Sequence, residues 1–125
     1  MVNEPATSTL DPELRTMLDS ATDVSDERAT CAARLFKALG EPVRVRLLSL
    51  VAQSVGGEVC FRDLADQFDM PQPSLSHHLK ILVNAGILER ERKGTWSRYR
   101  VIESHLAVLE NILRAGGPFR AVPCC

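Results

Sequence analysis

One stretch of the chain, residues 72–88 with the sequence QPSLSHHLKILVNAGIL, restricts the fold more than any other. Pro73 suits the first turn of a helix, Ser74 can cap one, and Gly86 suits a helix end. The apolar residues between these signals recur at spacings of four, three and one, at Leu75, Leu79, Leu82 and Val83. This periodicity predicts an amphipathic helix with a narrow apolar stripe on one face.

The opposite face of this helix carries small hydrogen-bonding groups, two imidazoles and one cation. A helix that is buried on one side and polar on the other can enter the major groove of DNA. The alternative is an ordinary surface helix whose polar face meets only water. The two histidines, His77 and His78, point about 100° apart on a helix, so they cannot readily share one metal ion. They are interpreted as base or phosphate contacts.

A β-hairpin is predicted directly after the helix. Residues 87–92 and 96–102 both alternate, with Trp96, Tyr99 and Val101 among the apolar positions, and Lys93-Gly94 supplies the turn. A helix followed by a hairpin with a basic tip is typical of a winged helix-turn-helix. The predicted fold class is therefore mainly α with a β-hairpin wing.

Charge is distributed unevenly along the chain. Residues 73–100 hold six Lys/Arg and two acids, for a net +4, whereas the first 28 residues hold seven acids and two arginines, for a net −5, and the total is −1. A near-neutral total does not argue against DNA binding, because phosphates respond to the local basic patch. The predicted DNA contacts are Gln72, Ser74, Ser76, His77, His78, Lys80, Arg90, Arg92, Lys93 and Arg98.

The length of 125 residues predicts a single domain. We expect a mobile segment over residues 1–10, a winged helix-turn-helix dimer domain over 11–115 and a flexible tail over 116–125. Further helices are predicted over 12–21, 25–39, 43–54, 62–68 and 103–115, with a short extended piece at 59–61. The 43–54 helix is apolar nearly all round, which favours a place in the core.

Composition limits the compartment and the assembly. No apolar run is long enough to cross a bilayer and no signal-peptide core is present, so we expect a cytoplasmic protein without membrane contact. Four cysteines in that compartment are expected as thiols. Leu14, Met17 and Leu18 at one end, and the apolar side of residues 106–113 at the other, would suit a two-fold dimer. The alternative is that both helices pack on their own domain.

Four segments resemble the ArsR/SmtB family of metalloregulatory repressors: LFKALGEPVRVRLLSLV, EVCFRDLADQF, QPSLSHHLKILVNAGIL and GTWSRYRV. The resemblance covers about residues 30–113. It is most specific in the L-x-x-x-x-R-x-x-I/L pattern around residues 41–48 and in the S-x-S-H-H-L-K-x-L helix. The resemblance implies a dimeric winged-helix repressor with four helices, a recognition helix, two strands and a last helix. It also implies an inducer that weakens operator binding through allosteric coupling.

Two sensing sites of that family are incomplete in this chain. The cysteine motif C-V-C-D-L corresponds to Cys60-Phe61-Arg62-Asp63-Leu64, so Arg62 replaces the second cysteine. A carboxylate and histidine site on the last helix is matched in its first half by Glu103 and His105. Gly116 and Phe119 stand where its second half should be. We interpret Glu103 and His105 as helix-cap and surface residues.

The vicinal pair Cys124-Cys125 follows a glycine- and proline-containing segment and is hard to explain by packing. With Cys60 it would supply three thiolates, a number that suits As(III), Sb(III) or Hg(II). The ligands would come from one protomer or from both. The alternative is a pair of exposed thiols without function. Cys31, next to two alanines, is either a small interface residue or a further ligand.

The sequence therefore predicts a repressor that binds double-stranded operator DNA as a homodimer and is released by a thiophilic metal(loid), with arsenite or antimonite preferred. Mercury(II) is one alternative inducer, and a cysteine redox or persulfide signal is another. No organic cofactor is expected. An enzyme is not supported, because the chain lacks a phosphate-binding glycine loop, a Cys-x-x-Cys motif and a nucleophile with its base.

Overall fold

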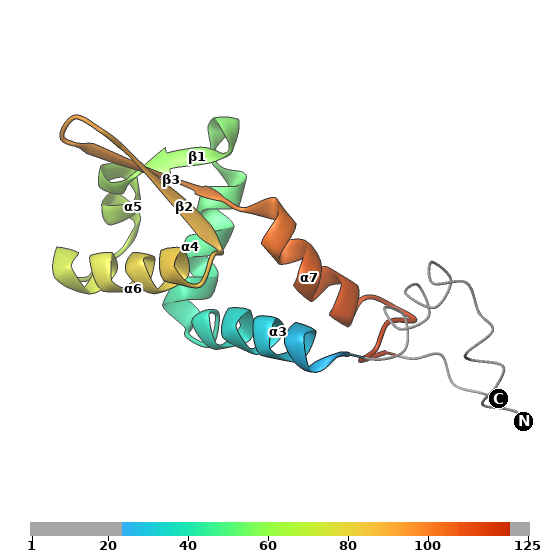
Figure 1. Cartoon of the computed structure of the whole chain (residues 1–125). Coiled ribbons are helices and arrows are strands. Elements are labelled where there is room, and N and C mark those ends of the chain that lie inside the picture. The colour runs from blue at the N-terminus through green and yellow to red at the C-terminus, as the bar shows by residue number, and fades with distance from the viewer. Residues whose placement is uncertain (1–23, 121–125) are drawn as a thin grey trace, which may run out of the picture.

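The computed structural model describes residues 24–120 (Figure 1). The helix predicted over 12–21 and the pair Cys124-Cys125 lie outside the described residues. In chain order the elements are α3 (Asp26–Ala38), α4 (Pro42–Gln53), the short helix η1 (Val55–Gly57), β1 (Glu58–Cys60), α5 (Phe61–Gln67), α6 (Gln72–Asn84), β2 (Leu88–Lys93), β3 (Trp96–Val101) and α7 (Glu103–Leu113). The predicted helices and hairpin over this range are confirmed, with bounds that differ by one or two residues.

Helix α3 begins where the sequence predicts it. The Ser25 side chain accepts a hydrogen bond from the backbone N–H of Arg28 at 3.2 Å, which satisfies one of the free amides of the first turn. Asp26 and Glu27 in the first turn and Lys37 in the last complement the helix dipole. These local interactions explain why the helix begins at this residue without reference to the rest of the fold.

Helix α4 is less buried than its composition predicts. Leu47 and Val51 are completely buried, but Val45 is 51% exposed. The expected place in the core is confirmed for the side that carries Leu47 and Val51, whereas the side that carries Val45 is exposed. The helix contacts α6, β1 and β3, which all lie toward the core, so its opposite side faces outward.

The hairpin belongs to a three-stranded antiparallel sheet. β1 pairs with β3, and the strand order is β1-β3-β2. Lys93 pairs with Trp96, so the turn consists of Gly94 and Thr95 rather than the predicted Lys93-Gly94. Gly94 has φ of +62°, a conformation that glycine adopts without steric cost. The sequence predicted β1 only as an isolated extended piece, because its partner strand β3 lies about 40 residues further along the chain.

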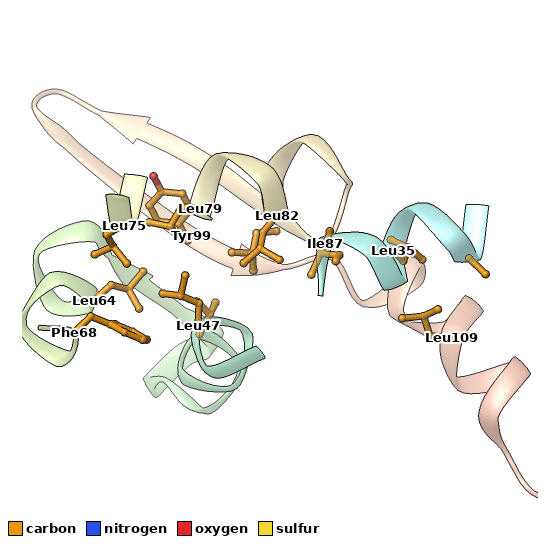
Figure 2. Close-up of a cluster of buried hydrophobic side chains, with 14 of the residues drawn as sticks. Leu35, Leu47, Leu64, Phe68, Leu75, Leu79, Leu82, Ile87, Tyr99 and Leu109 are labelled. Carbon is orange, nitrogen blue, oxygen red and sulfur yellow. The ribbon is translucent and has the colours of Figure 1, made fainter. Parts of the chain in front are cut away.

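The helix-turn-helix consists of α5 and α6, which share one apolar core with α4 and the sheet (Figure 2). Helix α6 begins at Gln72 with Pro71 as its N-cap, and Ser74 lies inside the first turn, so Ser74 does not cap the helix as predicted. The helix ends at Asn84, and Gly86 with φ of +85° turns the chain toward β2. The buried side chains at the centre of this core are Leu47, Leu64, Leu75, Leu79, Leu82, Ile87 and Tyr99.

Helix α7 packs against α3, where Leu109 lies near Leu35 (Figure 2). His105 in its first turn makes a 2.6 Å hydrogen bond with the carbonyl oxygen of Gly86. A carbonyl oxygen can only accept, so the Nδ1–H of His105 is the donor. This bond fixes the start of α7 to the end of the recognition helix.

Among the helices of residues 24–120, none is both long enough and apolar enough to span a bilayer.

Candidate nucleic-acid interface and the cysteine at its edge

The predicted contact residues on α6 have unequal surroundings. Leu75, Leu79 and Leu82 are buried, and this leaves the opposite side of the helix in solvent. Most of the predicted contacts are exposed, namely Gln72 at the start of the helix, and Ser74, Ser76, His77 and Lys80 away from the leucine stripe. These donors, the imidazole and the ammonium can therefore reach a groove without displacing protein contacts.

His78 is different, because it is half-buried between α6 and α4. Its Nδ1 lies 3.2 Å from Nη1 of Arg44, within hydrogen-bond distance. Arg44 also donates from Nε to the carbonyl oxygen of Ala38 at the end of α3. Since a guanidinium has donors only, His78 Nδ1 accepts and its proton is on Nε2. The His78–Arg44 pair thus joins three helices, a role that the sequence did not reveal.

Strand alternation divides the four predicted wing cations between two faces. Arg90 pairs with Tyr99 and Arg92 with Ser97, so these four residues share a face. Tyr99 is 7% exposed and belongs to the core that contains α6. Burial raises the pKa of the Tyr99 phenol, and the adjacent Arg90 guanidinium opposes that shift. Arg90 and Arg92 therefore project on the side of the sheet that faces the recognition helix.

Lys93 and Arg98 lie on the other face, where each has a carboxylate within ion-pair distance. Nη1 of Arg98 is 2.6 Å from Oε1 of Glu58, and Nζ of Lys93 is 3.8 Å from Oε1 of Glu91. Arg100 on the same face makes a 2.8 Å ion pair with Glu89, and this hydrogen bond raises the pKa of Arg100. On this face three acids balance three bases.

The face toward α6 has no such compensation. Arg90 donates to the hydroxyl of Ser97 at 3.1 Å from Nη2, and neither Arg90 nor Arg92 forms an ion pair within residues 24–120. Strand alternation around Tyr99 could have assigned Arg90 and Arg92 to one face, and Lys93 and Arg98 to the other, from the sequence alone. The ion pair between Glu58 and Arg98 could not be predicted from the sequence, because it requires β1 to lie beside β3.

Cys60 occupies the junction of β1 and α5. It is the last residue of the strand and the N-cap of the helix, and its thiol is free and half-buried. It pairs with Arg98, so it lies on the sheet face away from α6. A cavity of about 200 Å³ at this point is lined by Cys60, Phe61, Arg62, Thr95, Trp96 and Ser97. Arg62 places its guanidinium 4.9 Å from the centre of the Trp96 ring, which joins α5 to the base of the turn.

The described residues do not complete a metal site around this thiol. Within residues 24–120 no three His, Cys, Asp or Glu side chains are grouped so that they could hold one ion. The cavity offers a single sulfur, and Arg62 occupies the position of the second cysteine of the family motif. A three-thiolate site at Cys60 therefore needs two donors from outside the described residues. The predicted partners Cys124 and Cys125 lie there.

The remaining candidates are placed elsewhere. Cys31 is exposed on α3 beside Asp26, Glu27, Thr30 and Arg34. Cys31 and Cys60 line different cavities, and the role of Cys31 stays open. Glu103 is in the first turn of α7, and His105 is engaged with the Gly86 carbonyl, which agrees with their interpretation as helix-start residues.

A helix-turn-helix with a basic hairpin beside its second helix defines the winged helix-turn-helix class of DNA-binding proteins. The sequence model of a family described as bacterial regulatory proteins of the arsR family matches residues 41–90. An uncharacterized HTH-type transcriptional regulator of Methanocaldococcus jannaschii is 39% identical over 80 residues, which are 64% of this chain and 88% of that protein. The chain belongs to the ArsR/SmtB family of transcriptional regulators, as the resemblance predicted.

Further comparisons agree with this assignment. The repressor SmtB of Mycobacterium tuberculosis is 39% identical over 68% of this chain and 62% of its own length. The arsenical resistance operon repressor of Bacillus subtilis is 42% identical over 51% of this chain and 59% of its own. The chain thus spans less than two thirds of either repressor. These relatives are regulators and not enzymes, as predicted.

A solved structure extends the likeness to the fold. The homodimeric winged helix-turn-helix DNA-binding domain of a possible ArsR-family regulator from Mycobacterium bovis is 32% identical. It matches 68% of this chain and 79% of its own with a TM-score of 0.56.

Proposed function

We propose that this chain is a repressor that binds operator DNA through α6 and the adjacent side of the wing. The observation that carries the proposal is that the exposed side of α6 and the adjacent face of the wing both carry cations without an ion-pair partner among the described residues. The exposed side of α6 offers His77 and Lys80, and the face of the wing toward that helix carries Arg90 and Arg92. Side-chain donors on α6 would read bases, while the two arginines would contact phosphates.

We further propose that the inducer is a thiophilic metal(loid), with As(III) or Sb(III) preferred. Cys60 would bind it together with Cys124 and Cys125. The name of the Bacillus subtilis relative, an arsenical resistance repressor, supports an arsenical. The position of Cys60 supports a coupling route, because the cysteine is at once the end of β1 and the N-cap of α5. An ion there would act on both the wing and the helix-turn-helix.

The strength that this coupling needs is modest. A coupling free energy of about 1–3 kcal/mol between ion and DNA changes operator affinity roughly 5- to 150-fold. A shift of α5 relative to the wing at the Arg62–Trp96 contact is sufficient if it changes the angle between α6 and the hairpin.

We also propose that the chain works as a homodimer, as the Mycobacterium bovis neighbour does. Leu109 and Ile112 of α7 are buried within the chain itself. The apolar side chains left exposed near that helix are Phe36, Leu113 and Phe119, of which Phe36 and Phe119 stack at 6.4 Å. A two-fold dimer would cover this group and present two recognition helices to a palindromic site.

The experiment that tests the proposal is operator binding by fluorescence anisotropy. The wild type, Cys60→Ser and Cys124→Ser/Cys125→Ser are titrated with arsenite, antimonite, mercury(II), zinc and an oxidant. Release by arsenite or antimonite in the wild type, lost in both variants, is expected. Release by mercury(II) alone changes the ion and keeps the thiolate site. Release by oxidant alone points to a redox switch, and release by zinc contradicts the thiolate site.

A further inference from the structure

A second group of basic side chains lies beside α6, away from the wing. Arg34 and Lys37 on the last turns of α3 and Arg44 on the first turn of α4 surround a cavity of about 350 Å³. Ile81, Asn84 and Ala85 of α6 form its opposite wall, and no carboxylate lines it. Within residues 24–120, neither Arg34 nor Lys37 forms an ion pair. We name Arg34, Lys37 and Arg44 the α3–α4 basic cluster.

The position of the cluster follows from the geometry of α6. Leu79 points toward Tyr99 of the sheet (Figure 2). At about 100° per residue, Ile81 lies roughly 200° further round the helix, on the side that faces α3 and α4. The exposed residues His77 and Lys80 lie between these two directions. The wing and the C-terminal end of α3 accordingly stand on opposite flanks of the helix (Figure 1).

These two flanks correspond to the two edges of a DNA groove. The major groove is about 12 Å wide, and a helix with its side chains is about 10–12 Å across. A helix in the groove therefore has one phosphate strand on each side. Arg90 and Arg92 stand on one flank, and the α3–α4 basic cluster stands on the other.

We propose that the α3–α4 basic cluster binds the operator phosphate backbone on the edge of the major groove opposite the wing. The inference rests on the proposed DNA-binding function. Among the described residues the cationic ends of Arg34 and Lys37 have no ion-pair partner, and they would contact the phosphates. Arg44 is held by Ala38 and His78, so it acts as a positioning residue that fixes α3 and α6 relative to each other.

The chemistry of the cluster selects this partner. Three cations without an acid among the residues that line the cavity favour an anion, and Asn84, which lines the same cavity, is exposed on α6. A phosphate strand that passes the end of α6 would meet Asn84 and the ends of Arg34 and Lys37 together. Such contacts add affinity without sequence information, because they reach only the backbone.

The test measures affinity against salt with the full-length chain. The probes are a duplex that the wild type selects from a random pool and a scrambled duplex of equal length. Each lost phosphate contact lowers the slope of log K against log salt by about 0.9. The variant Arg34→Gln/Lys37→Gln loses two contacts in each protomer of the proposed dimer, so it should reduce the magnitude of the slope by about 3.6. It should weaken binding to both duplexes by a similar factor.

A matched control removes two charges elsewhere, in Arg100→Gln/Arg114→Gln, and should leave the slope unchanged. Urea midpoints verify that all variants fold. A wild type that selects no duplex from the random pool contradicts the proposed function itself. A wild type that binds, with an unchanged slope in Arg34→Gln/Lys37→Gln, overturns this inference alone. Stabilisation by inorganic phosphate at constant ionic strength, lost in that variant without a change of slope, overturns it in favour of a small-anion site.

Discussion

At the residue scale, two histidines that adjoin in the chain have different surroundings. His77 is exposed on the polar side of α6, whereas His78 is half-buried and bonded to Arg44. Periodicity places both on the polar part of the helix, because neither fits the leucine stripe. Only the position of α4 determines that one of them faces protein.

We predict that the two alanine variants affect different properties, with His78→Ala lowering stability and His77→Ala lowering operator affinity. His78→Ala should lower the free energy of unfolding by about 1 kcal/mol, because the half-buried Arg44 guanidinium loses a hydrogen-bond acceptor. His77→Ala should change it by less than about 0.5 kcal/mol and should weaken operator binding instead. Urea unfolding and anisotropy measure the two quantities. Equal losses of stability in both variants would contradict this assignment.

A second residue-scale feature is the glycine after α6. Gly86 has φ of +85°, and an added Cβ would lie 2.8 Å from Nδ1 of His105. Gly56 has a similar φ of +75° but nothing within 4 Å of an added Cβ. A comparison of substitutions at the two glycines therefore distinguishes the cost of backbone strain from the cost of the contact with His105 of α7.

We predict that Gly86→Ala destabilises more than Gly56→Ala. Both incur about 1–2 kcal/mol from the left-handed conformation. Gly86→Ala should lose about 1 kcal/mol more, because it displaces the side chain that binds the Gly86 carbonyl. In a His105→Ala background the two glycine variants should become equal, as measured by urea unfolding. A difference that persists there would exclude the contact as its cause.

At the element scale, the hairpin is a two-faced structure. One face carries Arg90 and Arg92 toward α6, and the other carries ion pairs that join β3 to β1 and β2. The sequence predicted Arg90, Arg92, Lys93 and Arg98 as DNA contacts without distinguishing the two faces of the wing. The register of the sheet divides them, since residues directly opposite on paired strands share a face.

We predict that the two faces contribute unequally to DNA binding. Arg90→Gln/Arg92→Gln should reduce the magnitude of the salt slope of operator affinity by about 3.6, because the proposed dimer loses two phosphate contacts in each protomer. Arg98→Gln/Arg100→Gln removes the same charge from the other face and should leave the slope unchanged. Anisotropy titrations at several salt concentrations measure both. If the second variant lowers the slope as much as the first, the strand register does not select the contacts.

At the scale of the whole molecule, three of the six large apolar side chains exposed within residues 24–120 lie on α3, at the end of α7 and in the segment after it. Phe119 is 61% exposed and Leu113 is 45% exposed, and Phe119 stacks on Phe36. Val55 is 98% exposed on η1, which contacts α4. The grouping on one end of the molecule favours an interface over isolated surface residues.

We predict that this group stabilises the proposed homodimer. Leu113→Asp and Phe119→Asp should each weaken dimerisation about tenfold or more, because a charge would be buried at the interface. Val55→Asp introduces the same charge elsewhere and should leave the dimer unchanged. Sedimentation equilibrium measures the association constants. A dimer that tolerates both substitutions would place its interface elsewhere.

The sequence by itself determined the helix-turn-helix and the hairpin, because local signals specify them. The leucine spacing of α6, the Ser25 cap of α3 and the alternation around Gly94 act within a few residues of the chain. Cys60 was identified instead by its match to the cysteine motif of the family, and its proposed ion-binding role stays a prediction. The local signals did not predict that β1 joins the sheet, and they placed the hairpin turn one residue too early, at Lys93-Gly94 instead of Gly94-Thr95.

Tertiary structure alone decided which polar groups remain available. Arg98 is neutralised by Glu58, 40 residues away, and His78 is engaged by Arg44, 34 residues away. Arg34 and Lys37 line one cavity with the end of α6, and this arrangement likewise requires α3 and α6 to lie side by side. The physical reason is the range of the interactions. Periodicity fixes the face on which a side chain lies, but only the packing of distant elements fixes the charge or hydrogen-bonding group that it meets there.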